Sequence, residues 1–234
     1  MRINEIYNMD FRKGIEQMLD ENIKIDMIIT DPPYNIGFKY DVYNDRMSDD
    51  DYIEMLQWFE NEPLAIIQYP EETMKYIVSA LGIPNKVLSW CYNSNIPRQF
   101  RLISIYGVTP DFNAVKQPYK NPTDKRIQQR IADGYEGARS YDWFDDIQLV
   151  KNVSNDKTEH PCPVPVELME RLILLTTEEG DTVLDPFMGS GTVAIACKNT
   201  NRNYIGFEVS KEYYNIAKKR IAGWVKQETL LDEY

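Results

Sequence analysis

The chain has 234 residues, of which 43% are hydrophobic and 27% are charged, and this composition is typical of a folded globular protein. No run of about eighteen apolar residues is present, so we expect no membrane span, and the N-terminal segment lacks the apolar stretch of a signal peptide. Three scattered cysteines and a single histidine give no pattern for a disulfide framework or a structural zinc site. We therefore expect a cytoplasmic protein with reduced thiols and no metal ion.

The net charge is −11, which taken alone argues against a nucleic-acid partner, because affinity for phosphates usually comes from lysine and arginine. The charge is unevenly distributed, however. Residues 41–72 carry ten acidic residues and a single basic one, whereas residues 112–140 carry six basic residues and three acidic ones. Because of this basic segment, the acidic net charge does not exclude a polyanionic partner.

The first half of the chain alternates apolar runs with helical periodicity. Residues 24–30 (KIDMIIT) form an apolar run that stops at two prolines, which is typical of a buried strand. Ser48, followed by Asp51, resembles a capping box at the start of a helix. The next predicted elements are a strand at 64–69, a helix at 71–81 and a strand at 86–90.

The second half begins with a different composition. Residues 108–157 are rich in Pro, Asn, Gly, Asp and Gln, and we expect a loop region there with one short helix near residues 125–131. Pro165 then opens an amphipathic helix. The last predicted elements are a strand at 182–184, a helix to about residue 200, a strand at 203–207 and a helix capped by Ser210. This alternation predicts an α/β fold, with a mostly parallel sheet and helices on both faces.

Residues 185–192 (DPFMGSGT) lie between a predicted strand and a predicted helix. Gly189 and Gly191 allow a sharp turn and a close approach of a ligand, and the helix N-terminus offers free N–H groups to a carboxylate. Glu208 ends the next strand about twenty residues further on, where it can accept hydrogen bonds from both ribose hydroxyls. The pattern favours a nucleoside cofactor site, although such a turn is also a common structural connection.

Residues 31–35 (DPPYN) directly follow the first predicted strand. An exocyclic amino nitrogen is a poor nucleophile because its lone pair is delocalised into the ring. The Asp31 carboxylate can accept one of its hydrogens and the Pro32 carbonyl the other, while Pro33 stiffens this carbonyl by fixing φ. Tyr34 offers a face on which a base can stack. Together with the glycine-rich turn, this motif predicts methyl transfer to a base, which must be flipped out of any duplex.

The two motifs resemble those of the DNA amino-methyltransferases, in which DPPY is the catalytic motif and the glycine-rich motif binds S-adenosylmethionine. Because DPPY comes first here, the chain resembles the circularly permuted β group of that family. The resemblance spans residues 4–221. It implies a Rossmann-like methyltransferase fold, one methyltransferase domain over residues 1–234, and catalytic roles for Asp31, Pro32, Pro33 and Tyr34.

The resemblance also implies a set of cofactor-binding residues. Asp10 matches an acidic residue that contacts the cofactor adenine, and His160 lies in a segment that leads to its methionine end. A purely structural role in a turn or loop is the alternative for both. The implied set is Asp10, His160, Asp185, Pro186, Phe187, Gly189, Ser190, Gly191, Thr192 and Glu208. No metal is implied, because the leaving group is a neutral thioether.

Family members usually carry a larger target-recognition insert than the one available here, which is residues 108–157. Either recognition is short, or a homodimer or partner subunit completes it. We expect basic side chains of this insert to contact the phosphates of double-stranded DNA, and a solvated mixed-charge surface is the alternative. The residues are Lys116, Lys120, Lys125, Arg126, Arg130 and Arg139.

The substrate base follows from the first residue of DPPY. In the resembling family, Asp at this position goes mainly with adenine and Ser mainly with cytosine, so adenine N6 is favoured over cytosine N4. An enzyme directed at RNA or at a protein amide stays open, as does an inactive DNA-binding subunit. The resemblance implies a bacterial or phage enzyme, as in restriction–modification. Aromatic residues at 40–52 and 90–92 either line the base pocket or belong to the core.

Overall fold

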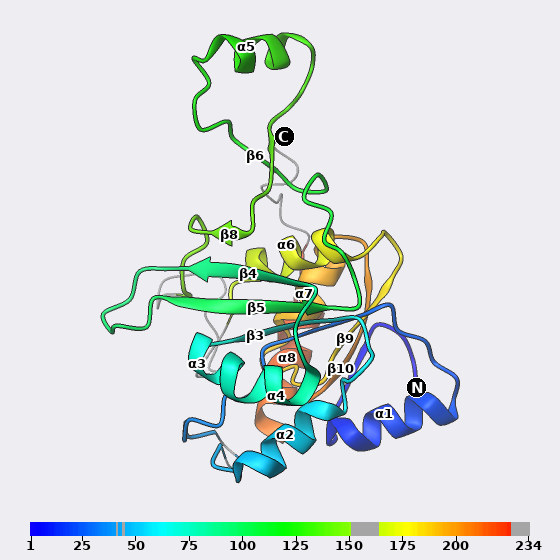
Figure 1. Ribbon diagram of the computed structural model, residues 1–234. Coiled ribbons are helices and arrows are strands. Elements are labelled where there is room, and N and C mark those ends of the chain that lie inside the picture. The colour runs from blue at the N-terminus through cyan, green and yellow to red at the C-terminus, as the bar shows by residue number, and fades with distance from the viewer. Residues whose placement is uncertain (41, 44, 151–163, 226–234) are drawn as a thin grey trace.

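The computed structural model describes residues 1–40, 42–43, 45–150 and 164–225, and a single eight-stranded sheet forms its centre (Figure 1). The strands are β1 (Glu5–Tyr7), β2 (Met27–Thr30), β3 (Leu64–Gln68), β4 (Lys86–Cys91), β5 (Phe100–Tyr106), β8 (Trp143–Phe144), β9 (Thr182–Asp185) and β10 (Asn203–Phe207). Their order is β1-β10-β9-β2-β3-β5-β4-β8. Neighbouring strands are parallel except that β5 runs antiparallel to both β3 and β4. The predicted α/β, Rossmann-like architecture is confirmed.

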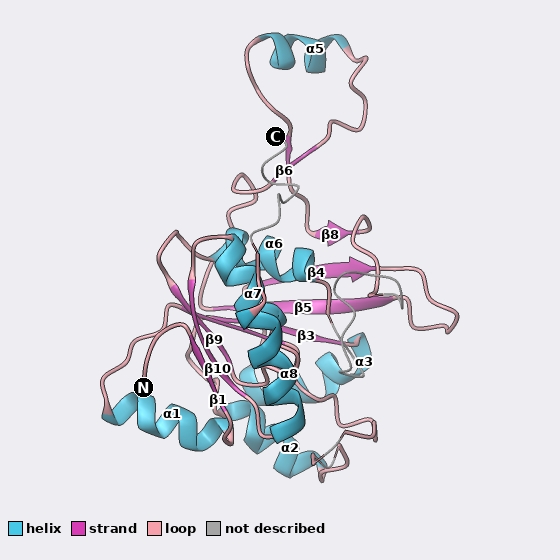
Figure 2. Cartoon of the chain, turned by 180° about the vertical axis from the view of Figure 1, so that it is seen from behind, coloured by secondary structure: helices cyan, strands magenta, loops and turns pink. Residues whose placement is uncertain are grey.

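Helices cover both faces of this sheet (Figure 2). The helices of one face are α1 (Phe11–Asp20), α2 (Asp49–Gln57), α3 (Pro70–Glu72) and α4 (Val78–Leu81), with a π-helical turn (Thr73–Ile77) joining the last two. The helices of the other face are α6 (Val166–Thr176), α7 (Thr192–Asn199) and α8 (Lys211–Ala222). Alternation along β2 divides the core accordingly, because Ile28 packs in the first layer and Met27 and Ile29 pack in the second.

Two helix starts match their predicted caps. The Ser48 hydroxyl accepts a hydrogen bond from the Asp51 N–H at 3.1 Å at the start of α2, and the Ser210 hydroxyl accepts one from the Tyr213 N–H at 3.3 Å at the start of α8. The helix predicted at 71–81 is present, but it is not a regular α-helix because the π-helical turn interrupts it. Strand β5 was not predicted from the sequence.

The middle part of the predicted loop region projects away from the sheet. Strands β6 (Lys116–Gln117) and β7 (Ala138–Arg139) form a short antiparallel ladder, and α5 (Lys125–Ala132) lies beyond them, far from the sheet (Figure 1). No residue of α5 is buried. We call residues 116–139 the α5 arm.

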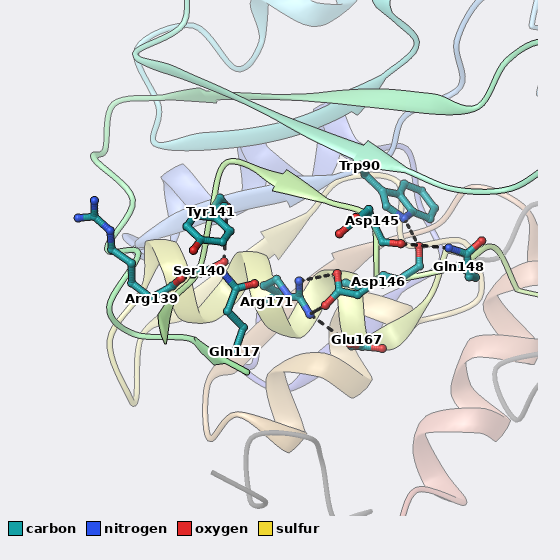
Figure 3. Close-up of polar contacts among 11 residues, drawn as sticks. Trp90, Gln117, Arg139, Ser140, Tyr141, Asp145, Asp146, Gln148, Glu167 and Arg171 are labelled. Carbon is teal, nitrogen blue, oxygen red and sulfur yellow. Dashed lines mark hydrogen bonds and ion pairs between the residues drawn. The ribbon is translucent and has the colours of Figure 1, made fainter. Parts of the chain in front are cut away.

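The chain segment that follows the arm is fixed to the body of the protein. The Trp90 indole donates a hydrogen bond to the Ile147 carbonyl at 2.7 Å (Figure 3). The Arg171 guanidinium, on α6, donates to both carboxylate oxygens of Asp146 at 2.9 and 2.8 Å, and it lies 4.9 Å from the Phe144 ring centroid. The α5 arm is therefore followed by a chain segment that is held firmly against β4 and α6. In the described part of the chain, no helix is long and apolar enough to cross a membrane.

Candidate active site

The two sequence motifs meet at one edge of the sheet. Strands β2 and β9 are parallel neighbours, with Ile28 opposite Leu184, so residues 31–35 and residues 185–192 leave the sheet side by side. The Thr30 hydroxyl donates a hydrogen bond to Asp185 Oδ1 at 2.8 Å and ties the two strand ends together. The two motifs therefore converge at the ends of neighbouring parallel strands.

A pocket of about 750 Å³, counted with the open space at its mouth, lies at this edge. The predicted residues that line it are Asp10, Asp31, Pro33, Pro186, Phe187, Gly189 and Glu208. Phe11, Phe207 and Tyr213 add aromatic surface to the wall of the pocket. The pocket thus combines carboxylates with aromatic surface, which fits a cofactor that joins a nucleoside to a positive charge.

Glu208 is held on the pocket wall by two backbone amides. Its Oε2 accepts a hydrogen bond from the Gly189 N–H, and its Oε1 accepts one from the Ser210 N–H, both at 2.8 Å. Gly191, with φ of 82°, is the N-cap residue of α7, and a Cβ there would lie 3.2 Å from the Ala217 Cβ. The glycine-rich turn is therefore shaped by backbone constraints and brings main chain directly to the ligand space.

Asp185 lies behind this pocket, 4% exposed. Its Oδ1 accepts hydrogen bonds from the Thr30 hydroxyl and from the Phe187 N–H at 3.0 Å. Burial raises the pKa of Asp185 to about 7, and these two hydrogen bonds oppose the rise. A smaller cavity of about 340 Å³ reaches both Asp185 and Asp31.

Ser190 and Thr192 line this smaller cavity rather than the main pocket. Arg220 of α8 donates to the Thr192 hydroxyl at 3.0 Å and to the Ser190 hydroxyl at 3.4 Å. These contacts bind the turn to α8.

The Asp31 carboxylate has one partner on each oxygen. The Tyr34 hydroxyl donates to Oδ1, and Arg101 Nη1 lies 3.5 Å from Oδ2. Burial raises the pKa of Asp31, while the Arg101 charge and the Tyr34 hydrogen bond oppose that rise. The Tyr34 ring is buried, edge-on to Tyr69 at 5.1 Å, and the Arg101 guanidinium lies 5.5 Å from its centroid. The stacking face expected for Tyr34 is therefore covered in this structure.

A second layer of hydrogen bonds supports the DPPY loop from behind. The Tyr52 hydroxyl of α2 donates to the Pro33 carbonyl at 2.5 Å, and Gln68 Nε2 donates to the Tyr52 hydroxyl at 2.5 Å. Both side chains are fully buried. The sequence left open whether Tyr52 belongs to the base pocket or to the core, and the structure places it in the core. Gln68 was given no role, and its only signal was a glutamine near the end of the apolar run 64–69.

The remaining predicted residues fall into four groups. Pro32 is buried and lines neither of the two cavities described above. Asp10 lines the pocket and also caps α1, where it accepts a hydrogen bond from the Arg12 N–H at 2.9 Å. His160 lies outside the described residues. The basic residues predicted to contact DNA are all exposed on the α5 arm, namely Lys116, Lys120, Lys125, Arg126, Arg130 and Arg139.

Comparison with known proteins places this site in a family. A family model described as DNA methylase matches residues 84–219. The chain belongs to the DNA methylase family. Its reaction is therefore methylation of DNA at an amino nitrogen, with S-adenosylmethionine as methyl donor, as the motifs predicted.

Individual relatives agree with this assignment. The chain is 35% identical to the type II methyltransferase M.HpaI of Haemophilus parainfluenzae, over 87% of this chain and 69% of that protein. It is 29% identical to M.BglII of Bacillus subtilis, over 94% of this chain and 69% of that protein. The crystal structure of the M1.HpyAVI–SAM complex superimposes with a TM-score of 0.63 at 27% identity, covering 93% of this chain and 98% of that one. The cytosine-N4-specific PvuII DNA methyltransferase shares the fold at 14% identity, with a TM-score of 0.63 over 98% of this chain and 89% of that one.

Proposed function

We propose that this DNA methylase acts on the N6 amino group of adenine in double-stranded DNA, with Asp31 as its principal catalytic residue. The observation that carries the proposal is a carboxylate at the start of the DPPY motif, on the wall of the pocket and directly after a buried strand. The Asp31 carboxylate accepts a hydrogen bond from one N–H of the amino group, and the Pro32 carbonyl accepts one from the other N–H. The nitrogen lone pair is thereby freed from conjugation with the ring.

Different pocket residues bind different parts of the cofactor. S-adenosylmethionine supplies a methyl group activated by its positive sulfonium centre. Glu208 accepts hydrogen bonds from the ribose hydroxyls, and Asp10 accepts a hydrogen bond from the amino group of the cofactor adenine. Asp31 and Asp185 give the inner end of the site a negative potential that suits a cation. The turn from Pro186 to Thr192, with Phe187, forms the remaining wall.

Access of the substrate base requires base flipping, because an amino group inside a duplex cannot reach Asp31. We assign binding of the DNA backbone to the α5 arm, whose exposed basic side chains can pair with phosphates. On this proposal residues 1–234 form one methyltransferase domain of the permuted β group, and residues 108–157 are its reduced recognition insert. Tyr34 supplies a stacking face only after the side chains that cover it move.

The direct experiment is to incubate the protein with methyl-labelled S-adenosylmethionine and unmethylated double-stranded DNA, and then to digest the product to nucleosides. We expect label in N6-methyldeoxyadenosine. Label in N4-methyldeoxycytidine would overturn the base assignment, and label in RNA alone would overturn the substrate. Cofactor binding without any transfer would indicate an inactive DNA-binding subunit. The exposed Asp20→Asn variant serves as a matched control that should methylate normally.

A further inference from the structure

Arg101 is a largely buried arginine that neither motif contains. It lies on β5 directly opposite Trp90 of β4, and its side chain is 13% exposed. Its Nη1 lies 3.5 Å from Asp31 Oδ2. The antiparallel strand β5 thus delivers a positive charge to the carboxylate that follows β2, two strands away in the sheet.

Four aromatic rings surround this guanidinium. Its central carbon lies 5.2 to 5.8 Å from their centroids. The rings belong to Tyr34, Tyr69, Trp90 and Tyr92. Arg101 Nε is buried and has no hydrogen-bond partner among the described residues. The four ring faces attract the cation and hold the guanidinium in one orientation. They do not replace the hydrogen bond that Nε loses on burial, so this arrangement costs desolvation free energy.

An ion pair so far removed from solvent is a poor source of stability, because an apolar pair of similar volume often stabilises a fold as well or better. A functional reason is therefore the better explanation where one partner is the catalytic carboxylate. Burial disfavours the charge of Asp31, and the Arg101 guanidinium and the Tyr34 hydrogen bond favour it. The groups that face Asp31 are Tyr34 on its own loop, Tyr52 of α2, Arg101 of β5 and Asp185 of β9. Arg101 is the one cation in that set.

We propose that Arg101 is a positioning residue for methyl transfer, which keeps Asp31 an ionised and correctly oriented carboxylate from within the cage of Tyr34, Tyr69, Trp90 and Tyr92. The inference rests on the role proposed above for Asp31. A protonated Asp31 is a much weaker acceptor for the amino hydrogen of the base. Arg101 also fixes Oδ2, so that the carboxylate keeps one orientation while the Tyr34 hydroxyl holds Oδ1.

The test is the pH profile of the single-turnover methylation rate, at saturating DNA and cofactor, for Arg101→Met and Arg101→Lys. Removal of the charge leaves only the Tyr34 hydrogen bond to oppose the effect of burial, so the pKa that governs the acidic limb rises. We expect Arg101→Met to lose about tenfold or more in rate near pH 6 and to regain much of it near pH 9. Lysine, which keeps the charge, should restore a profile close to that of the natural enzyme.

The matched control is Arg98→Met. Arg98 lies over the same Tyr69 ring, 4.6 Å from its centroid, but it pairs with Glu72 at 3.5 Å instead of Asp31. Its profile should coincide with that of the natural enzyme. If Arg101→Met unfolds, Arg101→Gln, which keeps polar contact without charge, carries the same test. A profile for the uncharged variant that is unshifted, or lowered equally at every pH, overturns the proposal.

Failure of this inference can be distinguished from failure of the proposed function by one further variant. If Asp31→Asn is inactive while the Arg101→Met profile is unshifted, only the role of Arg101 is wrong. If Asp31→Asn retains the natural rate, the role of Asp31 is wrong and that of Arg101 falls with it.

Discussion

Asp31 and Asp185 stand close together at the same sheet edge but in opposite electrostatic surroundings. Asp31 faces the guanidinium of Arg101, whereas Asp185 accepts its hydrogen bonds from neutral donors, the Thr30 hydroxyl and the Phe187 N–H. Burial therefore dominates at Asp185 and raises its pKa to about 7. Asp185 can therefore change its protonation near neutral pH when a cationic ligand arrives.

This contrast predicts a pH-dependent affinity for the cofactor. A nearby sulfonium favours the ionised form of Asp185, so binding of S-adenosylmethionine should strengthen by roughly three- to tenfold from about pH 6 to about pH 8. S-adenosylhomocysteine has a neutral thioether and should strengthen less. Calorimetric titration of both ligands measures the difference, which Asp185→Asn should abolish. Parallel curves for the two ligands in the natural enzyme would refute the assignment.

The same pKa fixes the sign of an effect on stability. Because the native pKa of Asp185 lies above its ordinary value of 3.8, the folded protein holds this proton more tightly than the unfolded chain. The group thus favours folding at low pH, and this contribution is lost as pH rises from about 4 to about 7. Without cofactor, Asp185→Asn should therefore show a flatter fall in the free energy of unfolding over that range, measured by urea titration. An equally steep fall would show that Asp185 titrates normally.

Tyr52 connects α2 to the catalytic loop through one hydroxyl. Tyr52→Phe should remove the hydrogen bond to the Pro33 carbonyl and leave the buried Gln68 amide without that partner. We expect a loss of about 1–3 kcal/mol in the free energy of unfolding, together with a slower methyl-transfer step. Tyr106→Phe is the matched control, because its hydroxyl donates to the Gly82 carbonyl at 3.0 Å, away from the site. Equal methylation rates for both variants would argue against a role for Tyr52 in supporting the loop.

At the scale of elements, the sequence predicted those parts whose signals are local. The caps of α2 and α8 and the apolar runs of β2 and β3 were all visible as short patterns. Strand β5 was missed because its apolar run is broken by two polar residues, Arg101 and Ser104, that nonetheless point into the protein. The strands of two residues, β6, β7 and β8, depend on pairing with distant segments and have no local signal of their own.

The residues of the candidate site likewise separate into those with a local sequence signal and those without one. The sequence could predict Asp31, Glu208 and the glycine-rich turn, because each belongs to a contiguous motif at a strand end. It could not predict Arg101, whose position beside Asp31 depends on the order β2-β3-β5 and on the register that sets it against Trp90. The buried Gln68 and Tyr52 likewise acquire their role only through packing between α2 and β3.

At the scale of the whole molecule, the two charged segments lie at opposite ends. Helix α2, which opens with three aspartates, lies at one end, and the basic α5 arm projects from the other (Figures 1 and 2). A polyanion approaching a molecule charged in this way is drawn toward the arm and away from α2. The acidic net charge is therefore compatible with a DNA substrate.

The arm gives a prediction about salt. Replacing Lys125, Arg126 and Arg130 by glutamine should lower the slope of log Kd against log salt concentration by about two to three, if each contacts a phosphate. The rate at saturating DNA should stay unchanged, because none of these residues reaches the pocket. A control with Lys24, Lys211 and Lys219 replaced by glutamine removes the same charge from exposed positions outside the arm. Identical slopes for the two triple variants would assign DNA contacts elsewhere.

The most direct test of the central claim is the single-turnover methylation rate of Asp31→Asn on double-stranded DNA, with cofactor affinity measured on the same sample. Asparagine keeps the size of the side chain but loses the negative charge that draws on the amino hydrogen. We predict a loss of about a thousandfold or more in rate with cofactor affinity changed by only a few fold. A rate close to that of the natural enzyme, with the cofactor bound, would contradict the assignment of Asp31 as the catalytic acceptor.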